Sequence, residues 1–222
     1  LIAEGYDEII LATGVSPRTL DLEGIDHPKV LDYVDVLYKN ASVGDKVAIV
    51  GAGGIGFDMA EYLAHDMSHE SVSLNTKNYM KEWGVDMSYA KGGALAEAPQ
   101  PLASPREIYL LKRSKGKHGK NLGKTTGWIH RSSLAMKDVK MLADVSYEKV
   151  DDQGLHIKVG EEHQILNVDH VVICAGQVSL KELEAGLQEA GQNVHLVGGA
   201  NIAAQLDAKM AIKEASELAA KL

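Results

Sequence analysis

Cysteine is almost absent from this sequence of 222 residues, in which Cys174 is the only one. A single cysteine excludes a disulfide within the chain. It also excludes an iron–sulfur cluster held by this chain alone, because such clusters need about four cysteine ligands. The composition therefore excludes the class of small disulfide-stabilised domains, and we expect a reducing, cytoplasmic setting.

Long apolar runs and an excess of positive charge are also missing. No apolar stretch approaches the roughly 20 residues of a membrane-spanning helix, so we expect no membrane partner. The formal net charge of −8 at pH 7 argues against nucleic acid as a partner, because binding it requires a positive surface. The chain starts at Leu1, without an initiator methionine or a signal-peptide pattern, and we expect it to be part of a longer protein.

Short apolar runs that end at or near glycine are the main pattern present. They lie at residues 8–12, 46–50 and 170–174, and such runs are typical of buried parallel strands in α/β proteins. We predict further strands at 107–113, 139–142, 165–168 and 194–197, a hairpin over 145–159, and helices over 32–38, 55–65, 129–136 and 203–222. The polar stretch 69–105 is too long for a plain loop and is predicted to be an insertion with some local structure.

One glycine motif has a chemical meaning. An apolar strand precedes, and a helix-compatible stretch follows, the run Gly51-Ala52-Gly53-Gly54-Ile55-Gly56. In a dinucleotide-binding turn, Gly51 would permit the sharp bend, Gly53 would let the backbone approach a diphosphate, and Gly56 would let the helix pack on the sheet. The helix start would then offer N–H groups to phosphate. A glycine-rich turn that binds nothing is the alternative.

A basic cluster indicates which nicotinamide cofactor would bind. The strand expected at 108–111 ends in Lys112-Arg113-Ser114-Lys115, without a carboxylate. NAD enzymes usually have an acidic residue at this point for the ribose 2′-hydroxyl, whereas cations suit the 2′-phosphate of NADP. Arg113 can hold a phosphate through two parallel hydrogen bonds, with Lys115 beside it, so we predict NADPH as the cofactor. A solvated basic loop is the alternative.

Several segments resemble one family of flavoproteins. The strand that ends in Thr13-Gly14 looks like the exit from an FAD-binding domain, and residues 197–201 look like the last FAD-binding turn of such a domain. Together with residues 24–30, 119–131 and 206–208, they resemble the C-terminal third of the bacterial NADPH-dependent 2,4-dienoyl-CoA reductases, which are flavin oxidoreductases of the Old Yellow Enzyme type. The resemblance covers essentially the whole chain.

The resemblance implies an α/β fold in which a Rossmann-like nucleotide-binding domain is inserted into a partial FAD-binding domain. Residues 1–44 and 172–222 would be the remnants of the FAD domain, and residues 45–171 would bind NADPH. FMN and a 4Fe–4S cluster would lie in an N-terminal barrel outside this chain, together with the catalytic residues of the dienoyl step. We therefore predict no catalytic residue and no metal site here.

The resemblance also implies contacts with FAD. Gly199, Asn201 and the helix start Gln205-Leu206-Asp207 would face the flavin cofactor, and Asn201 stands where related proteins usually have aspartate. Thr13-Gly14 and Ala175-Gly176 would lie where the two domains meet their cofactors.

In this family NADPH passes hydride to FAD, and the electrons then reach FMN, which reduces a 2,4-dienoyl-CoA during the β-oxidation of unsaturated fatty acids. The sequence is therefore interpreted as the NADPH-handling part of an oxidoreductase of fatty acid metabolism. Its partners would be these small molecules and the N-terminal barrel of the same protein. Two alternatives remain open: a related enoate reductase or amine dehydrogenase flavoprotein, and a non-catalytic nucleotide-binding module.

Overall fold

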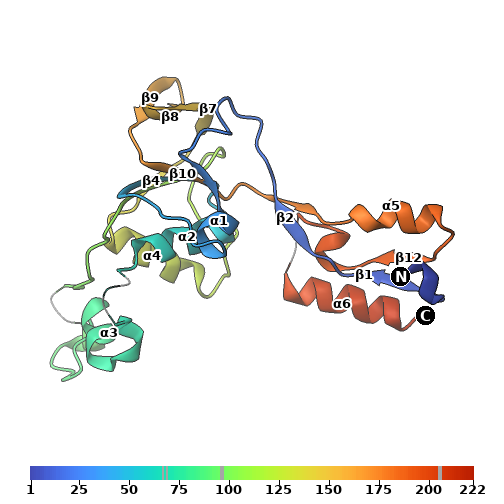
Figure 1. Ribbon diagram of the computed structural model, residues 1–222. Coiled ribbons are helices and arrows are strands. Elements are labelled where there is room, and N and C mark those ends of the chain that lie inside the picture. Colours follow the sequence, from blue (N-terminus) through green and yellow to red (C-terminus); the bar gives the residue numbers. More distant parts are fainter. Residues whose placement is uncertain (67, 69, 96–97, 205–206) are drawn as a thin grey trace. The chain divides into compact units, whose positions relative to one another are not determined.

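The computed structural model describes all residues except 67, 69, 96–97 and 205–206 (Figure 1). The chain forms two compact units, Leu1–Thr19 with Gly176–Leu222, and Leu20–Ala175. Along the sequence the second unit is inserted into the first, and the predicted α/β class with an inserted Rossmann-like domain is confirmed. Residues 20–44 belong to the second unit, whereas the cofactor-domain limits expected from the resemblance would group them with residues 1–19.

A parallel sheet forms the centre of the second unit. Its five strands run in the order β3 (Val30–Asp32), β10 (His170–Ile173), β4 (Lys46–Val50), β5 (Glu107–Leu111) and β6 (Lys140–Leu142). All neighbouring pairs are parallel. Because β4 lies in the middle and both faces of the sheet are covered, Val47, Ile49 and Val50 have 0% exposure.

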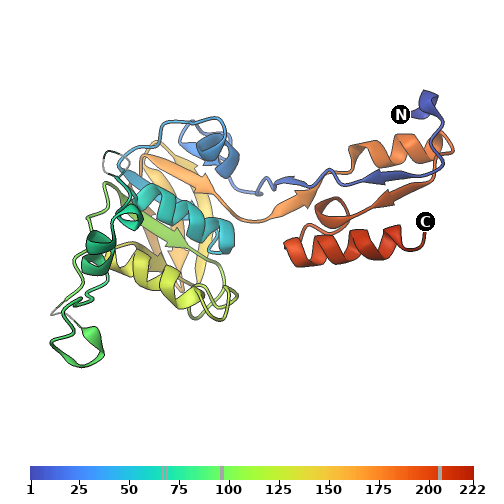
Figure 2. The ribbon, with the colours of Figure 1, turned by 90° about the horizontal axis from the view of Figure 1, so that it is seen from below.

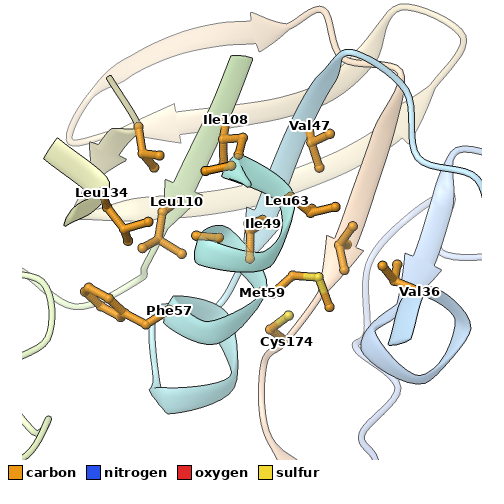
Figure 3. Packing of buried hydrophobic residues seen from close by; sticks show 14 residues of the cluster. Val36, Val47, Ile49, Phe57, Met59, Leu63, Ile108, Leu110, Leu134 and Cys174 are labelled. Carbon is orange, nitrogen blue, oxygen red and sulfur yellow. The ribbon is translucent and has the colours of Figure 1, made fainter. Parts of the chain in front are cut away.

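Helices cover one face of this sheet. They are α1 (Tyr33–Leu37), α2 (Gly54–Ala64) and α4 (Gly127–Met136). Figure 3 shows the side chains of α2 packed over the strands, where Met59 and Leu63 lie one helical turn apart in the buried cluster. Since α2 follows β4 and α4 connects β5 to β6, both helices begin at the carboxyl edge of the sheet.

An antiparallel sheet covers the other face. It consists of β7 (Val145–Asp151), β8 (Gly154–Val159) and β9 (Glu162–Leu166), in that order. Side chains alternate along a strand, so Ala48 and Val50 of β4 join the cluster on this face, together with Leu155 and Ile157 of β8. The predicted hairpin over 145–159 is confirmed.

The long segment between α2 and β5 contains local structure, as predicted. It forms the 3₁₀ turns η2 (Val72–Leu74) and η3 (Gly92–Ala94) and the short helix α3 (Thr76–Glu82). The side chain of Asn75 caps α3 by accepting a hydrogen bond from the N–H of Asn78. Trp83, just after α3, contacts Trp128 of α4 edge-on, with 6.3 Å between ring centroids, which attaches the insertion to the helical layer.

The first unit contains two pairs of short strands. β1 (Ile9–Leu11) runs parallel to β12 (Val194–Leu196) (Figure 2), and β2 (Val15–Pro17) pairs antiparallel with β11 (Gln177–Ser179). The unit also contains the 3₁₀ turns η1 (Ile2–Glu4) and η4 (Gly198–Ala200), and the helices α5 (Glu182–Glu189) and α6 (Ala208–Ala219).

The last helix begins later than the sequence predicts. We expected a helix from residue 203, but α6 starts at Ala208. The side chain of Asp207 accepts a hydrogen bond from the N–H of Met210 at 2.7 Å, which is the usual way an aspartate caps a helix start. None of the helices in the described part of the chain has the length and apolar character that a membrane span requires.

Candidate functional site

The glycine-rich turn lies at the carboxyl end of the central strand β4. Gly51 has a φ of +111°, and its N–H donates to the carbonyl oxygen of Leu111 on β5 at 3.0 Å. A Cβ at this position would lie 2.6 Å from the carbonyl oxygen of Cys174. Glycine is therefore required at position 51 both by the backbone conformation and by the lack of space.

Gly56 allows helix α2 to pack directly against this turn. A Cβ on Gly56 would lie 1.8 Å from the carbonyl oxygen of Gly51. The residue is buried. The close helix–strand packing that the third glycine of such motifs provides is therefore present.

The remaining two glycines of the motif border open space. Nothing lies within 4 Å of a Cβ built on Gly53 or Gly54. No side chain caps α2, and its first turn has no acidic residue. The first hydrogen bond inside the helix is donated by Phe57 to Gly53 at 3.0 Å, so the N–H groups before it have no acceptor within the helix. A diphosphate fits such a site, because it needs N–H donors and close access to backbone.

Ala52 and Ile55 are the two residues of the motif that are not glycine. Both are partly buried and pack against the cluster under α2. Ala175 lies on the other side of the turn, since its Cα would be 3.0 Å from a Cβ on Gly51. The structure thus brings Ala175 to the motif from a segment more than a hundred residues away in the sequence.

The loop after β5, called the basic loop from here on, spans residues 112–126 and leads to α4. It packs against α2, because a Cβ on Gly119 would lie 3.0 Å from the ring of Phe57, and Leu122 contacts the same cluster. The basic loop therefore lies at the same edge of the sheet as the glycine-rich turn. Its cations are Lys112, Arg113, Lys115, Lys117, Lys120 and Lys124.

Arg113 is exposed, but the backbone on both sides of it is fixed. The N–H of Lys112 donates to the carbonyl oxygen of Leu142 at 3.0 Å, and the N–H of Asp144 donates to the carbonyl oxygen of Ser114 at 3.4 Å. Within the residues that the structure describes, no carboxylate forms an ion pair with Arg113. Its guanidinium is therefore available to an anion.

Lys115, unlike Arg113, forms an ion pair with a carboxylate. Its Nζ lies 3.4 Å from Oδ2 of Asp144, and the two side chains are 83% and 39% exposed. An exposed pair of this kind contributes only about 0–1 kcal/mol, but it places a carboxylate beside the basic loop. The sequence around the cluster showed no carboxylate, because Asp144 comes from the connection between β6 and β7.

Reasoning from the sequence missed two residues of this region. Burial raises the pKa of Tyr147 to about 12, and the charge of Arg113 opposes that rise, which shows that Arg113 lies near the phenol. His118 is buried within the basic loop, at 6% exposure. A histidine in a run of glycines and lysines gives no sequence signal for burial.

Cys174 is a buried structural thiol. Its N–H donates to the carbonyl oxygen of Val50 at 2.8 Å, which continues the pairing of β10 with β4. Burial, and to a lesser extent the charge of Asp32, raises the pKa of the thiol to about 12. The thiolate needed for nucleophilic or redox chemistry is therefore scarce at neutral pH.

Thr13, Gly14 and Gly176 lie in the first unit, where they flank the antiparallel pair β2–β11. The hydroxyl of Thr13 donates to the carbonyl oxygen of Leu180, and the N–H of Leu180 donates to the carbonyl oxygen of Gly14 at 3.0 Å. Gly176 has a φ of +100°, and its carbonyl oxygen accepts from the N–H of Arg18 at 3.2 Å.

The turn η4 of the first unit is organised by Glu214 of α6. Its carboxylate accepts hydrogen bonds from the N–H of Gly198, at 2.5 Å, and from the side-chain amide of Asn201. Gly199 is buried beside them. Gln205 and Leu206, expected to face FAD together with Asp207, lie outside the described residues. The flavin contacts of all these residues stay predictions.

Comparison with known proteins agrees with this geometry. The family model described as pyridine nucleotide-disulphide oxidoreductase matches residues 3–211. A cinnamate reductase of Clostridium sporogenes is 30% identical over 197 residues, which are 89% of this chain and 24% of the relative. The chain thus spans about a quarter of the length of this curated relative.

Solved structures with the same fold include two larger enzymes. One is a 2-naphthoyl-CoA reductase in complex with 2-naphthoyl-CoA, with a TM-score of 0.73 and 20% identity over 100% of this chain and 28% of that chain. The other is a histamine dehydrogenase from Rhizobium sp., with a TM-score of 0.67 and 14% identity over 100% of this chain and 31% of that chain.

The family model extends over both units, and the turn after β4 leaves open space at Gly53 and Gly54. The chain therefore belongs to the pyridine nucleotide-disulphide oxidoreductase family, and this membership implies an oxidoreductase that binds FAD and a nicotinamide dinucleotide.

Proposed function

We propose that this chain is the NADPH-binding part of a flavin-dependent reductase and that it orients NADPH for hydride transfer to FAD. The proposal depends on what lies at the carboxyl ends of two neighbouring strands, β4 and β5. Open space lies at Gly53 and Gly54 at the start of α2, while the guanidinium of Arg113, which forms no ion pair with the described residues, follows the next strand of the sheet. Diphosphate and 2′-phosphate would each find donors there.

The chain's own residues would bind and orient the dinucleotide. Gly53 and Gly54 leave room for the diphosphate, and Gly51 and Gly56 hold the turn in the required shape. The nicotinamide, when bound, supplies the hydride, and the flavin of the whole enzyme accepts it. Catalysis by this chain would then consist of holding the donor in place.

The choice of NADPH over NADH would depend mainly on Arg113. Lys115 already faces Asp144 at 3.4 Å, so part of its charge is compensated and a nearby carboxylate would oppose a second anion. Arg113 has a fixed backbone and no ion pair among the described residues. A planar guanidinium can also form two parallel hydrogen bonds with phosphate, which an ammonium cannot.

The substrate that we propose is a 2,4-dienoyl-CoA, reduced in the cytoplasm during the breakdown of unsaturated fatty acids. FMN, a 4Fe–4S cluster and an N-terminal barrel of the same protein would complete the enzyme. Support comes from the resemblance of residues 119–131, from a relative that is named for reducing cinnamate, and from a similar fold in an enzyme that reduces a CoA ester. The relatives are long enough to contain such a barrel.

An amine dehydrogenase is the second candidate, because histamine dehydrogenase shares the fold over the whole chain. The full-length protein, supplied with NADPH, would be assayed with a 2,4-dienoyl-CoA and with cinnamate. It would be assayed with histamine in the presence of an artificial electron acceptor. NADPH oxidation that depends on the dienoyl-CoA supports the first proposal. Oxidation of histamine without NADPH would replace it with the second.

The cofactor proposal is tested by Arg113→Ala in the full-length protein, with dissociation constants measured for NADPH and NADH. The substitution should weaken NADPH by about 1.5–3 kcal/mol, the value of a hydrogen bond to a charged group, and leave NADH nearly unchanged. Lys158→Ala is the matched control, since Lys158 is a surface cation paired with Glu161 in the antiparallel sheet. Equal weakening of both dinucleotides, or of neither, would refute the assignment of Arg113.

A further inference from the structure

His118 is a buried imidazole within an otherwise exposed loop. Its Nε2 lies 3.2 Å from the carbonyl oxygen of Leu110 and 3.1 Å from that of Leu142. Leu110 belongs to β5 and Leu142 to β6, which are neighbouring strands. The ring therefore attaches the basic loop to the carboxyl ends of two strands of the parallel sheet.

The hydrogen-bond partners determine which form of the ring is present. Carbonyl oxygens only accept, so Nε2 must carry the hydrogen and donate to both of them. Burial holds the pKa of His118 below its ordinary value, and the nearby charge of Lys112 adds to this effect. At neutral pH the ring is therefore an uncharged donor, and it contributes no positive charge to the loop.

Lys112 also holds the loop through its side chain. Its Nζ donates to the carbonyl oxygen of Lys117 at 2.9 Å and to that of Lys115 at 3.3 Å. These two bonds close the backbone of the loop into a compact turn just after Arg113. Of the cations in the basic loop, Lys112 is thus the one that the loop itself uses.

A third attachment connects the loop to the helices. Gly119, next to His118, lies against the ring of Phe57 in α2, and its carbonyl oxygen accepts from the guanidinium of Arg131 in α4 at 3.2 Å. The loop is therefore fixed to the sheet, to α2 and to α4. A loop with three glycines, at 116, 119 and 123, would otherwise be mobile, because glycine allows many backbone conformations.

We propose that His118 and Lys112 are positioning residues that hold the basic loop in the conformation in which Arg113 meets the 2′-phosphate of NADPH. The inference rests on the proposed function. A mobile loop would have to be ordered when NADPH binds, and that ordering reduces affinity, whereas a fixed loop avoids the loss. NADH lacks the 2′-phosphate, and its diphosphate is held by the turn at the start of α2. Its binding should therefore depend little on His118.

The test compares two substitutions of His118 in the full-length protein, by dissociation constants for NADPH and NADH. His118→Phe keeps a ring but removes the donor, and it should raise the NADPH constant by about tenfold and the NADH constant by less than about twofold. His118→Gln keeps an N–H donor and should restore most of the NADPH affinity. His163→Phe is the control, because His163 is exposed and pairs with Glu148 in the antiparallel sheet.

A double substitution distinguishes positioning from general support of the fold. If His118 acts through Arg113, then His118→Phe should weaken NADPH little further in a protein that already has Arg113→Ala. Additive effects, or equal weakening of NADH and NADPH by His118→Phe, would overturn the inference. If His118→Phe does not fold, Lys112→Met replaces it, with the same expected loss of NADPH preference and the same contradicting results.

The result for Arg113→Ala alone separates the cofactor proposal from the positioning role of His118 and Lys112. If Arg113→Ala leaves the ratio of NADPH to NADH affinity unchanged, the assignment of Arg113 in the proposed function fails. If that ratio falls for Arg113→Ala but is unchanged for His118→Phe and Lys112→Met, the cofactor proposal stands and the positioning role is refuted.

Discussion

At the scale of single residues, the glycines of the glycine-rich turn after β4 fall into two kinds. Gly56 is required by packing, because a Cβ would lie 1.8 Å from the carbonyl oxygen of Gly51. Gly53 has an ordinary φ of −83° and borders open space. The fold itself therefore needs glycine at position 56, whereas Gly53 leaves open space in which the proposed diphosphate would fit.

This difference predicts opposite results for two alanine substitutions. Gly56→Ala should reduce the free energy of unfolding by at least about 2 kcal/mol, since backbone must move to make room. Gly53→Ala should cost less than about 1 kcal/mol, the difference between alanine and glycine at a helix start, yet weaken both NADPH and NADH. Urea unfolding and dinucleotide titration measure the two effects. A Gly53→Ala protein that binds both cofactors normally would show that no diphosphate lies there.

Cys174 predicts how stability depends on alkaline pH. Burial raises the pKa of the folded thiol to about 12, from the ordinary value of 9.0. Between these values the unfolded chain has released the proton and the folded chain has kept it, so stability falls as pH rises. The contribution of the thiol should be up to about 1.4 kcal/mol per pH unit.

Thermal or urea unfolding at pH 8, 8.5 and 9 measures this slope, and Cys174→Ala should flatten it. These pH values lie below the range in which Tyr147 contributes, because the ordinary pKa of tyrosine is 10.0. A slope that is the same in both proteins would mean that the buried thiol is not its cause.

A candidate site residue could be proposed from the sequence where its neighbours in the chain indicate its role. Residues that come together only through strand pairing could not be proposed in this way. The six-residue run 51–56 and Arg113 could be proposed from the sequence because the neighbouring residues indicate their role, and their cofactor contacts stay predictions. Asp144 and Tyr147 reach the basic loop only through the pairing of β5 with β6 and the start of β7. Glu214 likewise reaches Asn201 across the first unit, and no spacing in the sequence indicates that contact.

At the scale of elements, the strength of the apolar pattern decided which predictions succeeded. The strand over 46–50 was predicted with its observed bounds, because it is continuous, apolar and ends at glycine. Strands β2 and β11 were missed, since each has three residues and no buried side chain. Helix α5 was missed because it contains Gly186 and buries only Leu187.

The start of α6 offers a further prediction at this scale. Asp207 caps the helix through its bond to the N–H of Met210, and it is also one of the residues expected to face FAD. Asp207→Ala should cost about 1 kcal/mol in the free energy of unfolding, and Asp207→Ser should restore it, because serine also caps. Flavin content of the purified full-length protein is measured in parallel.

The two roles of Asp207 give different patterns. If the residue only caps α6, the serine protein keeps its normal flavin content. If the carboxylate also contacts FAD, the serine protein is stable but holds less flavin. Equal stability of the wild-type and Asp207→Ala proteins would contradict the capping role.

At the scale of the whole molecule, the buried clusters follow the division into two units. Every residue of the two large clusters lies between Leu20 and Ala175. The described part of the first unit contains a much smaller cluster, formed by Ile9, Leu11 and Leu187 with Val194 and Leu196 packed against them. A unit with its own large core can fold independently, whereas one with so few buried residues cannot supply enough apolar burial.

We therefore expect a fragment of residues 20–175 to fold and to bind NADPH with a dissociation constant within about threefold of the full-length value. The informative control is residues 45–171, the NADPH domain expected from the resemblance. It lacks residues 20–44, which include Leu22, β3 and α1 with Val36, and it also lacks the buried residues Val172, Ile173 and Cys174 at and just after the end of β10. It should lose at least about 3 kcal/mol of stability, because each buried leucine or valine contributes roughly 1.5–3 kcal/mol. Circular dichroism during urea unfolding compares the fragments, and equal stability would show that residues 20–44 do not belong to the folding unit.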